Sequence, residues 1–156
     1  MRIQLVPLGL TAALLLLCTP PNFAAPACPV TVPNGATPPG ENPSALHHGN
    51  GELWTVLYEG GQLVFGGNDG FTLVNGSMAM KFPFWRGVEG PLHVEGRNLH
   101  APDERLRAHI PGGYDTTGFQ ATGLFFPSVG CWEVTAGAGD ASLTFVTQVL
   151  RLDAAD

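Results

Sequence analysis

From Glu52 onward the chain is a succession of short apolar stretches, each bounded by Gly, Asn, Asp or Pro. They read ELWTVLY, QLVF, FTLV, SMAMKF, PLHVEG, RLRAHI, FQATGLFF, CWEVTA and SLTFVTQVLRL. Short segments at regular spacing, separated by turn residues, indicate β-strands that pack as a sandwich or a barrel. Because no window shows the period of an amphipathic helix, we predict an all-β fold.

Two of these stretches show which way their side chains point. RLRAHI alternates apolar Leu106, Ala108 and Ile110 with polar residues, which is typical of an antiparallel strand with one wet face. SMAMKF alternates in the same way and places Met78, Met80 and Phe82 on its apolar face. Before it, Asn75-Gly76 predicts a hairpin with a two-residue type I′ turn, which requires positive φ at both residues.

The amino terminus has the three parts of a secretory signal: Arg2, the apolar run LVPLGLTAALLLL, and a small-residue stretch that ends at Ala27. The apolar run is too short to span a bilayer as a helix, and Pro20-Pro21 end it. We therefore predict export, cleavage after Ala27 and a secreted or periplasmic product without a membrane span, either free or attached to the cell envelope.

Four segments follow from this pattern. We predict a signal peptide at 1–27, an extended arm or loop rich in Pro and Gly at 28–51, a single β-domain at 52–152 and a short tail at 153–156. Within the arm, only PVTV could form a short edge strand.

The cysteines allow two interpretations of the mature amino terminus. Cys18 lies in the signal, so Cys28 and Cys131 remain as a pair in an oxidising compartment, which predicts one disulfide between the arm and the domain. The alternative is a lipid anchor at Cys28, because Ala25-Pro26-Ala27-Cys28 loosely resembles a lipobox. Cys131 would then be unpaired.

The carboxy-terminal third, GLFFPSVGCWEVTAGAGDASLTFVTQV, reads as strands joined by a Pro-Ser-Val-Gly corner and a Gly-Ala-Gly-Asp turn. It resembles the final hairpin of bacterial immunoglobulin-like domains. GCWEVT followed by SLTFV is similar to a group of small secreted bacterial proteins with no established activity. The resemblance implies an immunoglobulin-like antiparallel β-sandwich behind the Pro/Gly-rich arm, and it bears on fold rather than function. It departs from antibody domains, which pair two cysteines across the sandwich.

Charge and motifs exclude several functions. The formal net charge is −6, and loss of Arg2 with the signal makes it more negative, which argues against nucleic acid and anionic membrane partners. The sequence has no Gly-x-Ser-x-Gly, His-Glu-x-x-His, phosphate-binding glycine loop or Cys-x-x-Cys. We therefore predict a non-enzymatic binding or structural module with a protein or glycan partner.

The run Phe84-Trp85-Arg86 is the candidate contact surface for that partner. Pro83 cannot donate to a strand ladder, so the three residues after it are expected to leave the strand. An aromatic side chain beside Arg in a turn is typical of binding hot spots. The alternative is that Trp85 folds back to cap the open end of the sandwich.

A copper site is the alternative function. Met78 and Met80 point the same way from one strand, and thioethers are soft ligands that suit Cu(I), with His as a common companion. The imidazoles could come from His47, His48 and His100. The competing interpretation is that both methionines fill the core, where Met is common.

Overall fold

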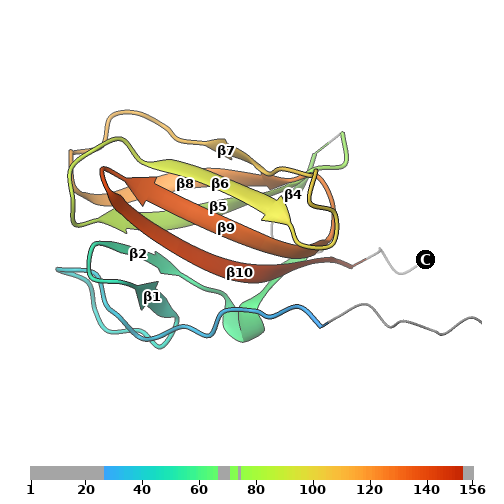
Figure 1. The fold of residues 1–156 in the computed structure, drawn as a ribbon, viewed down its shortest axis with the longest axis horizontal. Helices are drawn as coiled ribbons and strands as arrows, with labels where there is room; N and C mark the ends of the chain where they lie inside the picture. The colour runs from blue at the N-terminus through green and yellow to red at the C-terminus, as the bar shows by residue number, and fades with distance from the viewer. Residues whose placement is uncertain (1–26, 67–70, 74, 153–156) are drawn as a thin grey trace, which may run out of the picture.

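The computed structural model describes residues 27–66, 71–73 and 75–152. Apart from Ala27, the predicted signal lies outside the described residues, as does the predicted tail. In the described ranges the regular structure is ten β-strands and one short 3₁₀ turn, η1 (Glu59–Gly61). The strands form two sheets that pack face to face (Figure 1). The predicted all-β sandwich is confirmed.

The first sheet has six strands and the second has four. In spatial order the first sheet contains β1 (His47–Gly49), β2 (Leu53–Val56), β5 (Met78–Arg86), β8 (Gly118–Phe126) and β7 (Arg107–His109), with β4 (Phe71–Thr72) also paired to β5. The second sheet contains β3 (Gln62–Phe65), β10 (Ala141–Arg151), β9 (Gly130–Ala138) and β6 (His93–Asn98). These strands pair antiparallel except β3, which runs parallel to β10.

This strand order is that of an immunoglobulin-like sandwich. The strands β2, β5, β8 and β7 correspond to the A, B, E and D strands of that fold, and β6, β9 and β10 correspond to C, F and G. The first strand is split, because β2 pairs in one sheet and β3 continues in the other. The predicted fold class is therefore confirmed, and the pairing adds the strand order, which periodicity does not provide.

The core lies between the sheets and is rich in aromatic side chains. Phe82 stacks on Phe145 across the two sheets with ring centroids 5.5 Å apart. Phe126 meets Trp132 edge to face, also at 5.5 Å. Trp132 is fully buried, and its indole N–H donates to the carbonyl of Ser128 at 3.1 Å, which fixes the corner between β8 and β9. A buried indole needs such a partner because an unpaired donor in a core is costly.

The predicted strand faces are confirmed. On β7 and its flanks, Leu106, Ala108 and Ile110 pack into the core, and Met78 and Met80 do so on β5. The hairpin at Asn75-Gly76 is present, but the prediction of a type I′ turn is wrong. Of these two residues only Gly76 has a positive φ, of 82°, and its N–H donates to the carbonyl of Leu73.

The expectation that Pro83 ends its strand is wrong, because β5 continues to Arg86. On one edge of β5, β4 pairs with Met78 and Ala79 and β2 pairs from Phe84 onward, so Pro83 falls between these two neighbours. A proline is tolerated where it removes no ladder bond from a neighbour on that edge. The Pro83 carbonyl instead accepts from the hydroxyl of Thr55 at 2.8 Å.

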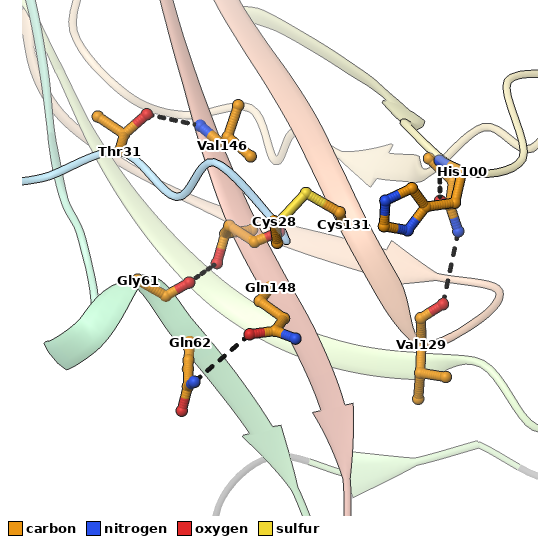
Figure 2. The surroundings of a disulfide bond; sticks show 11 residues. Cys28, Thr31, Gly61, Gln62, His100, Val129, Cys131, Val146 and Gln148 are labelled. Atoms are coloured by element: carbon orange, nitrogen blue, oxygen red, sulfur yellow. Dashed lines mark hydrogen bonds between the residues drawn. A yellow bond between two sulfur atoms is a disulfide. The ribbon is translucent and has the colours of Figure 1, made fainter. Parts of the chain in front are cut away.

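The first residues of the arm lie beside β10 of the second sheet. The N–H of Thr31 donates to the carbonyl of Val146 at 2.9 Å, and the Thr31 hydroxyl accepts from the N–H of Val146 at 2.8 Å (Figure 2). PVTV therefore lies beside β10 without being a regular strand. Farther along the predicted arm, His47–Gly49 pairs with β2 as β1.

Candidate functional site

The predicted disulfide is present. Cys28 in the arm is bonded to Cys131 at the start of β9, with their Cα atoms 5.4 Å apart (Figure 2). Cys131 is buried, and the bond closes a sequence separation of 103 residues. The sulfur of Cys28 is consumed by this bond, so it is not available for the lipid anchor considered above.

The three predicted contact residues do not form an exposed surface. Phe84 is fully buried in the core, and Trp85 and Arg86 are only 8% and 6% exposed. The cause is the continuation of β5. Its alternation sends Phe84 and Arg86 toward the space between the sheets and Trp85 to the outer face of the first sheet.

Trp85 belongs to an aromatic row on that outer face. Trp54 on β2 and Phe119 on β8 lie directly opposite Trp85, so the three side chains share a face. Trp85 and Phe119 meet edge to face at 5.4 Å, and Tyr114 contacts Phe119 at 6.1 Å. Phe119 and Tyr114 are 47% and 38% exposed. Phe119 and Tyr114 are therefore the exposed members of this aromatic group, and they were not predicted from the sequence as contact residues.

The arm covers Trp85, which explains its burial. The Trp85 indole N–H donates to the carboxylate of Glu41 at 3.1 Å, and the His47 ring lies 6.0 Å away in an edge contact. Trp54 can lie flat over β1 because Gly49 has no side chain. A Cβ built on Gly49 would stand 2.1 Å from Cδ1 of Trp54.

Three connections meet at one end of the sandwich. They are 87–92 between β5 and β6, 110–117 between β7 and β8, and the turn at 139–140 between β9 and β10. In Figure 1 the arrows of β5 and β9 point toward this end, at the left of the view. Two connections touch at Gly90, where φ is 125° and an added Cβ would stand 2.6 Å from the backbone nitrogen of Gly139. We call this the loop end.

A cavity of about 590 Å³ opens at the loop end. Its lining combines residues of β5 and β8 with the connections at 87–92 and 110–117. The lining residues are Arg86, Gly90, Pro91, Leu92, Ile110, Pro111, Gly112, Gly113, Tyr114, Asp115, Thr116 and Gln120. Leu92 and Ile110 also contact the core cluster, so the cavity has an apolar floor and a polar wall.

The polar wall is formed by two side chains whose hydrogen-bonding capacity is only partly used. The Arg86 guanidinium donates to the carbonyls of Gly90, at 2.7 Å, and Asp115, but its Nε has no partner among the described residues. Gln120 donates to the carbonyl of Pro111 at 3.0 Å, while its Oε1 accepts from no group in the described part of the chain. Both residues are only 6% exposed. Unpaired polar atoms at this depth are unfavourable, so a partner that supplies the missing bonds would be stabilising.

The buried charge of Arg86 is not neutralised by a carboxylate. Among the described residues no carboxylate lies within 4.0 Å of the Arg86 guanidinium, whereas Arg97 pairs with Glu133 at 2.8 Å on the exposed face of the other sheet. Both contacts of Arg86 are neutral backbone carbonyls. A desolvated cation without a counterion favours binding of an anion.

The residues proposed as copper ligands are not brought together. Met78 and Met80 pack in the core, whereas His47 lies on the outer face against Trp85, five residues and roughly 17 Å along β5 from Met80. His48 is on β1, and His100 is exposed on the far side of the disulfide (Figure 2). Within the described part of the chain no three His, Cys, Asp or Glu residues are grouped as metal ligands.

His48 gives a pH-dependent prediction. Burial lowers its pKa below the ordinary value of 6.5, and its Nδ1 has no hydrogen-bond partner in the described ranges. The unfolded chain therefore takes up the proton more readily, so stability from this residue is present above pH 6.5 and is lost as pH falls toward the folded-state pKa. We expect His48→Gln to lose less stability than the wild type between about pH 7.5 and about pH 5 in urea titrations. Equal losses in the two proteins would contradict this assignment.

No helix in the described ranges is both long and apolar enough to cross a bilayer. The chain matches no family model, no curated protein and no solved structure. The geometry of the loop end is therefore the observation that bears on function.

Proposed function

We propose that this protein is a secreted, non-enzymatic binding module whose ligand enters the cavity at the loop end. The observation that carries the proposal is the pair of buried, incompletely bonded side chains, Arg86 and Gln120, in the wall of a cavity of about 590 Å³. Ligand sites are commonly cavities of roughly 300–1,000 Å³ with mostly apolar walls and a few directed polar groups.

The architecture supports this location. In variable immunoglobulin domains the connections B–C and F–G at one end of the sandwich form the antigen-binding loops. Here the equivalent connections are 87–92 and 139–140 at the loop end. This correspondence is an analogy of fold. It is strengthened by the exposed rings of Tyr114 and Phe119 beside the cavity, because aromatic side chains supply contact area at low entropic cost.

The lining favours binding over catalysis. Among the described residues that line the cavity there is one carboxylate, Asp115, and no His, Cys or Lys that could act as base or nucleophile. We do not propose the copper alternative, because Met80 and His47 lie on opposite faces of β5.

Location and partner remain part of the proposal. The signal-like amino terminus, the resemblance to small secreted bacterial proteins and a disulfide, which persists in oxidising compartments, support export to the periplasm, cell envelope or medium. The partner that presents the ligand would be a protein or a glycan.

A ligand screen followed by amide NMR tests the proposed location. Anionic, neutral and cationic fragments would be titrated into the isotope-labelled mature protein. We expect the fragments that bind to shift amide signals of 87–92 and 110–117. Tyr114→Ala should weaken these fragments, whereas Val129→Ala, which removes an exposed side chain at the opposite end, should not. Binding that maps elsewhere, or no binding by any class of fragment, would overturn the proposal.

A further inference from the structure

Arg86 and Gln120 are placed to act on one ligand. In the register between β5 and β8, Arg86 is opposite Gly118, so Gln120 is its diagonal neighbour. Diagonal residues share a face with Cα atoms about 7–8 Å apart, and both side chains line the same cavity. A single small group could therefore contact the guanidinium and the amide together.

The unused atoms of the two residues define complementary chemistry. A guanidinium has five N–H donors, and the contacts of Arg86 to Gly90 and Asp115 use two of them. The remaining donors, Nε–H among them, suit a carboxylate, which binds arginine through two parallel hydrogen bonds. The free Oε1 of Gln120 needs a donor instead, such as an amide N–H or a hydroxyl.

We infer that the cavity recognises a free carboxylate with an N–H donor on the adjacent carbon and an apolar body, which is the chemistry of an N-acylated amino acid. The carboxylate would bind Arg86, the amide N–H would donate to Gln120, and the side chain would pack on Leu92 and Ile110. The inference rests on the proposed function, because it names the ligand class of the same cavity.

The overall negative charge of the protein does not prevent this binding. Charges farther away than the Debye length, about 8 Å at physiological salt, are largely screened, while a buried cation is screened less. The carboxylate of Asp115 lies at the rim, and only its backbone carbonyl contacts Arg86. The local field at the wall is therefore dominated by the guanidinium.

The test compares three small probes by NMR titration of the mature protein. N-acetyl-L-phenylalanine carries both groups, its primary amide lacks the charge, and 3-phenylpropionate lacks the N–H. We expect a dissociation constant on the order of 1 mM for the first probe, as is usual for so small a ligand. The amide should bind at least about tenfold more weakly, because it loses the charged hydrogen bonds. The propionate should bind about threefold to tenfold more weakly.

Two variants separate recognition from a structural role. Arg86→Met should abolish the preference for N-acetyl-L-phenylalanine over its primary amide. Gln120→Met should keep that preference but abolish the preference for N-acetyl-L-phenylalanine over 3-phenylpropionate. If Arg86 only ties the two connections together, the wild type would bind acid and amide equally. That result would overturn the inference. If Arg86→Met does not fold, the binding of the three probes to Gln120→Met and to the wild type still tests the inference.

The same titration distinguishes the two sources of such a carboxylate. An acetylated pentapeptide ending in phenylalanine should bind as tightly as N-acetyl-L-phenylalanine if the ligand is the carboxyl terminus of a polypeptide, and much more weakly if it is a small metabolite. Failure of the whole set to bind, with other fragments still mapping to the loop end, would refute the carboxylate assignment and leave the proposed function standing. Failure of all fragments would refute both.

Discussion

Removal of the disulfide is expected to lower the free energy of unfolding by about 4 to 5 kcal/mol, and the melting temperature by roughly 15 °C. The reason is entropic. The bond closes a loop that spans 103 residues, which is nearly the whole domain, so the oxidised unfolded chain has far fewer conformations than the reduced one. The measurement is chemical and thermal unfolding of Cys28→Ala/Cys131→Ala against the oxidised wild type. Both positions are changed together so that no buried free thiol is left at position 131.

A matched control separates the covalent bond from the other contacts of the arm. Thr31→Val removes the hydroxyl that accepts from Val146 but keeps the disulfide, and should cost only about 1 kcal/mol. Reduced wild type should unfold like the double variant. A loss below about 1 kcal/mol in the double variant would contradict the entropic account and show that the arm adds little constraint to the unfolded chain.

The strands could be predicted because their signals are local. Alternation with a period of two placed Leu106 and Met78 toward the core, and Gly, Asn and Pro marked the connections. Pro83 was misleading for a physical reason. The cost of a proline depends on whether a neighbour pairs with that edge of the strand, and the gap between β4 and β2 is a property of the sheet.

Local sequence patterns could have predicted only part of the candidate site. Once β5 is extended through Pro83, its alternation places Arg86 on the same face as Phe82 and Phe84, which would have predicted a buried cation at the end of the core. The diagonal placement of Arg86 and Gln120, which are about 34 residues apart in sequence, depends on the register of β5 and β8. Local patterns do not determine such a register, nor the contact between Glu41 and Trp85.

Replacement of Trp85 is expected to destabilise the protein by about 3 kcal/mol or more, as is usual when a buried Trp is truncated to Ala. Trp85 is only 8% exposed and packs between Trp54 and Phe119. Its indole N–H also donates to the carboxylate of Glu41. Its removal would also break the hydrogen bond that ties Glu41 of the arm to β5. Urea unfolding of Trp85→Ala, compared with the wild type at one pH, gives the value.

Two companion variants divide that loss into its parts and test its cause. Glu41→Gln keeps an acceptor for the indole N–H and should cost about 1 kcal/mol or less, because only the charge on that hydrogen bond is lost. Phe119→Ala removes an exposed ring from the same row, and the expected cost is below that of Trp85→Ala because less buried area is lost. If Trp85→Ala kept wild-type stability and lost ligand binding, Trp85 would be a contact residue, as first predicted from the sequence. A stable loss of binding in Phe119→Ala alone would place the contact on the exposed part of the row.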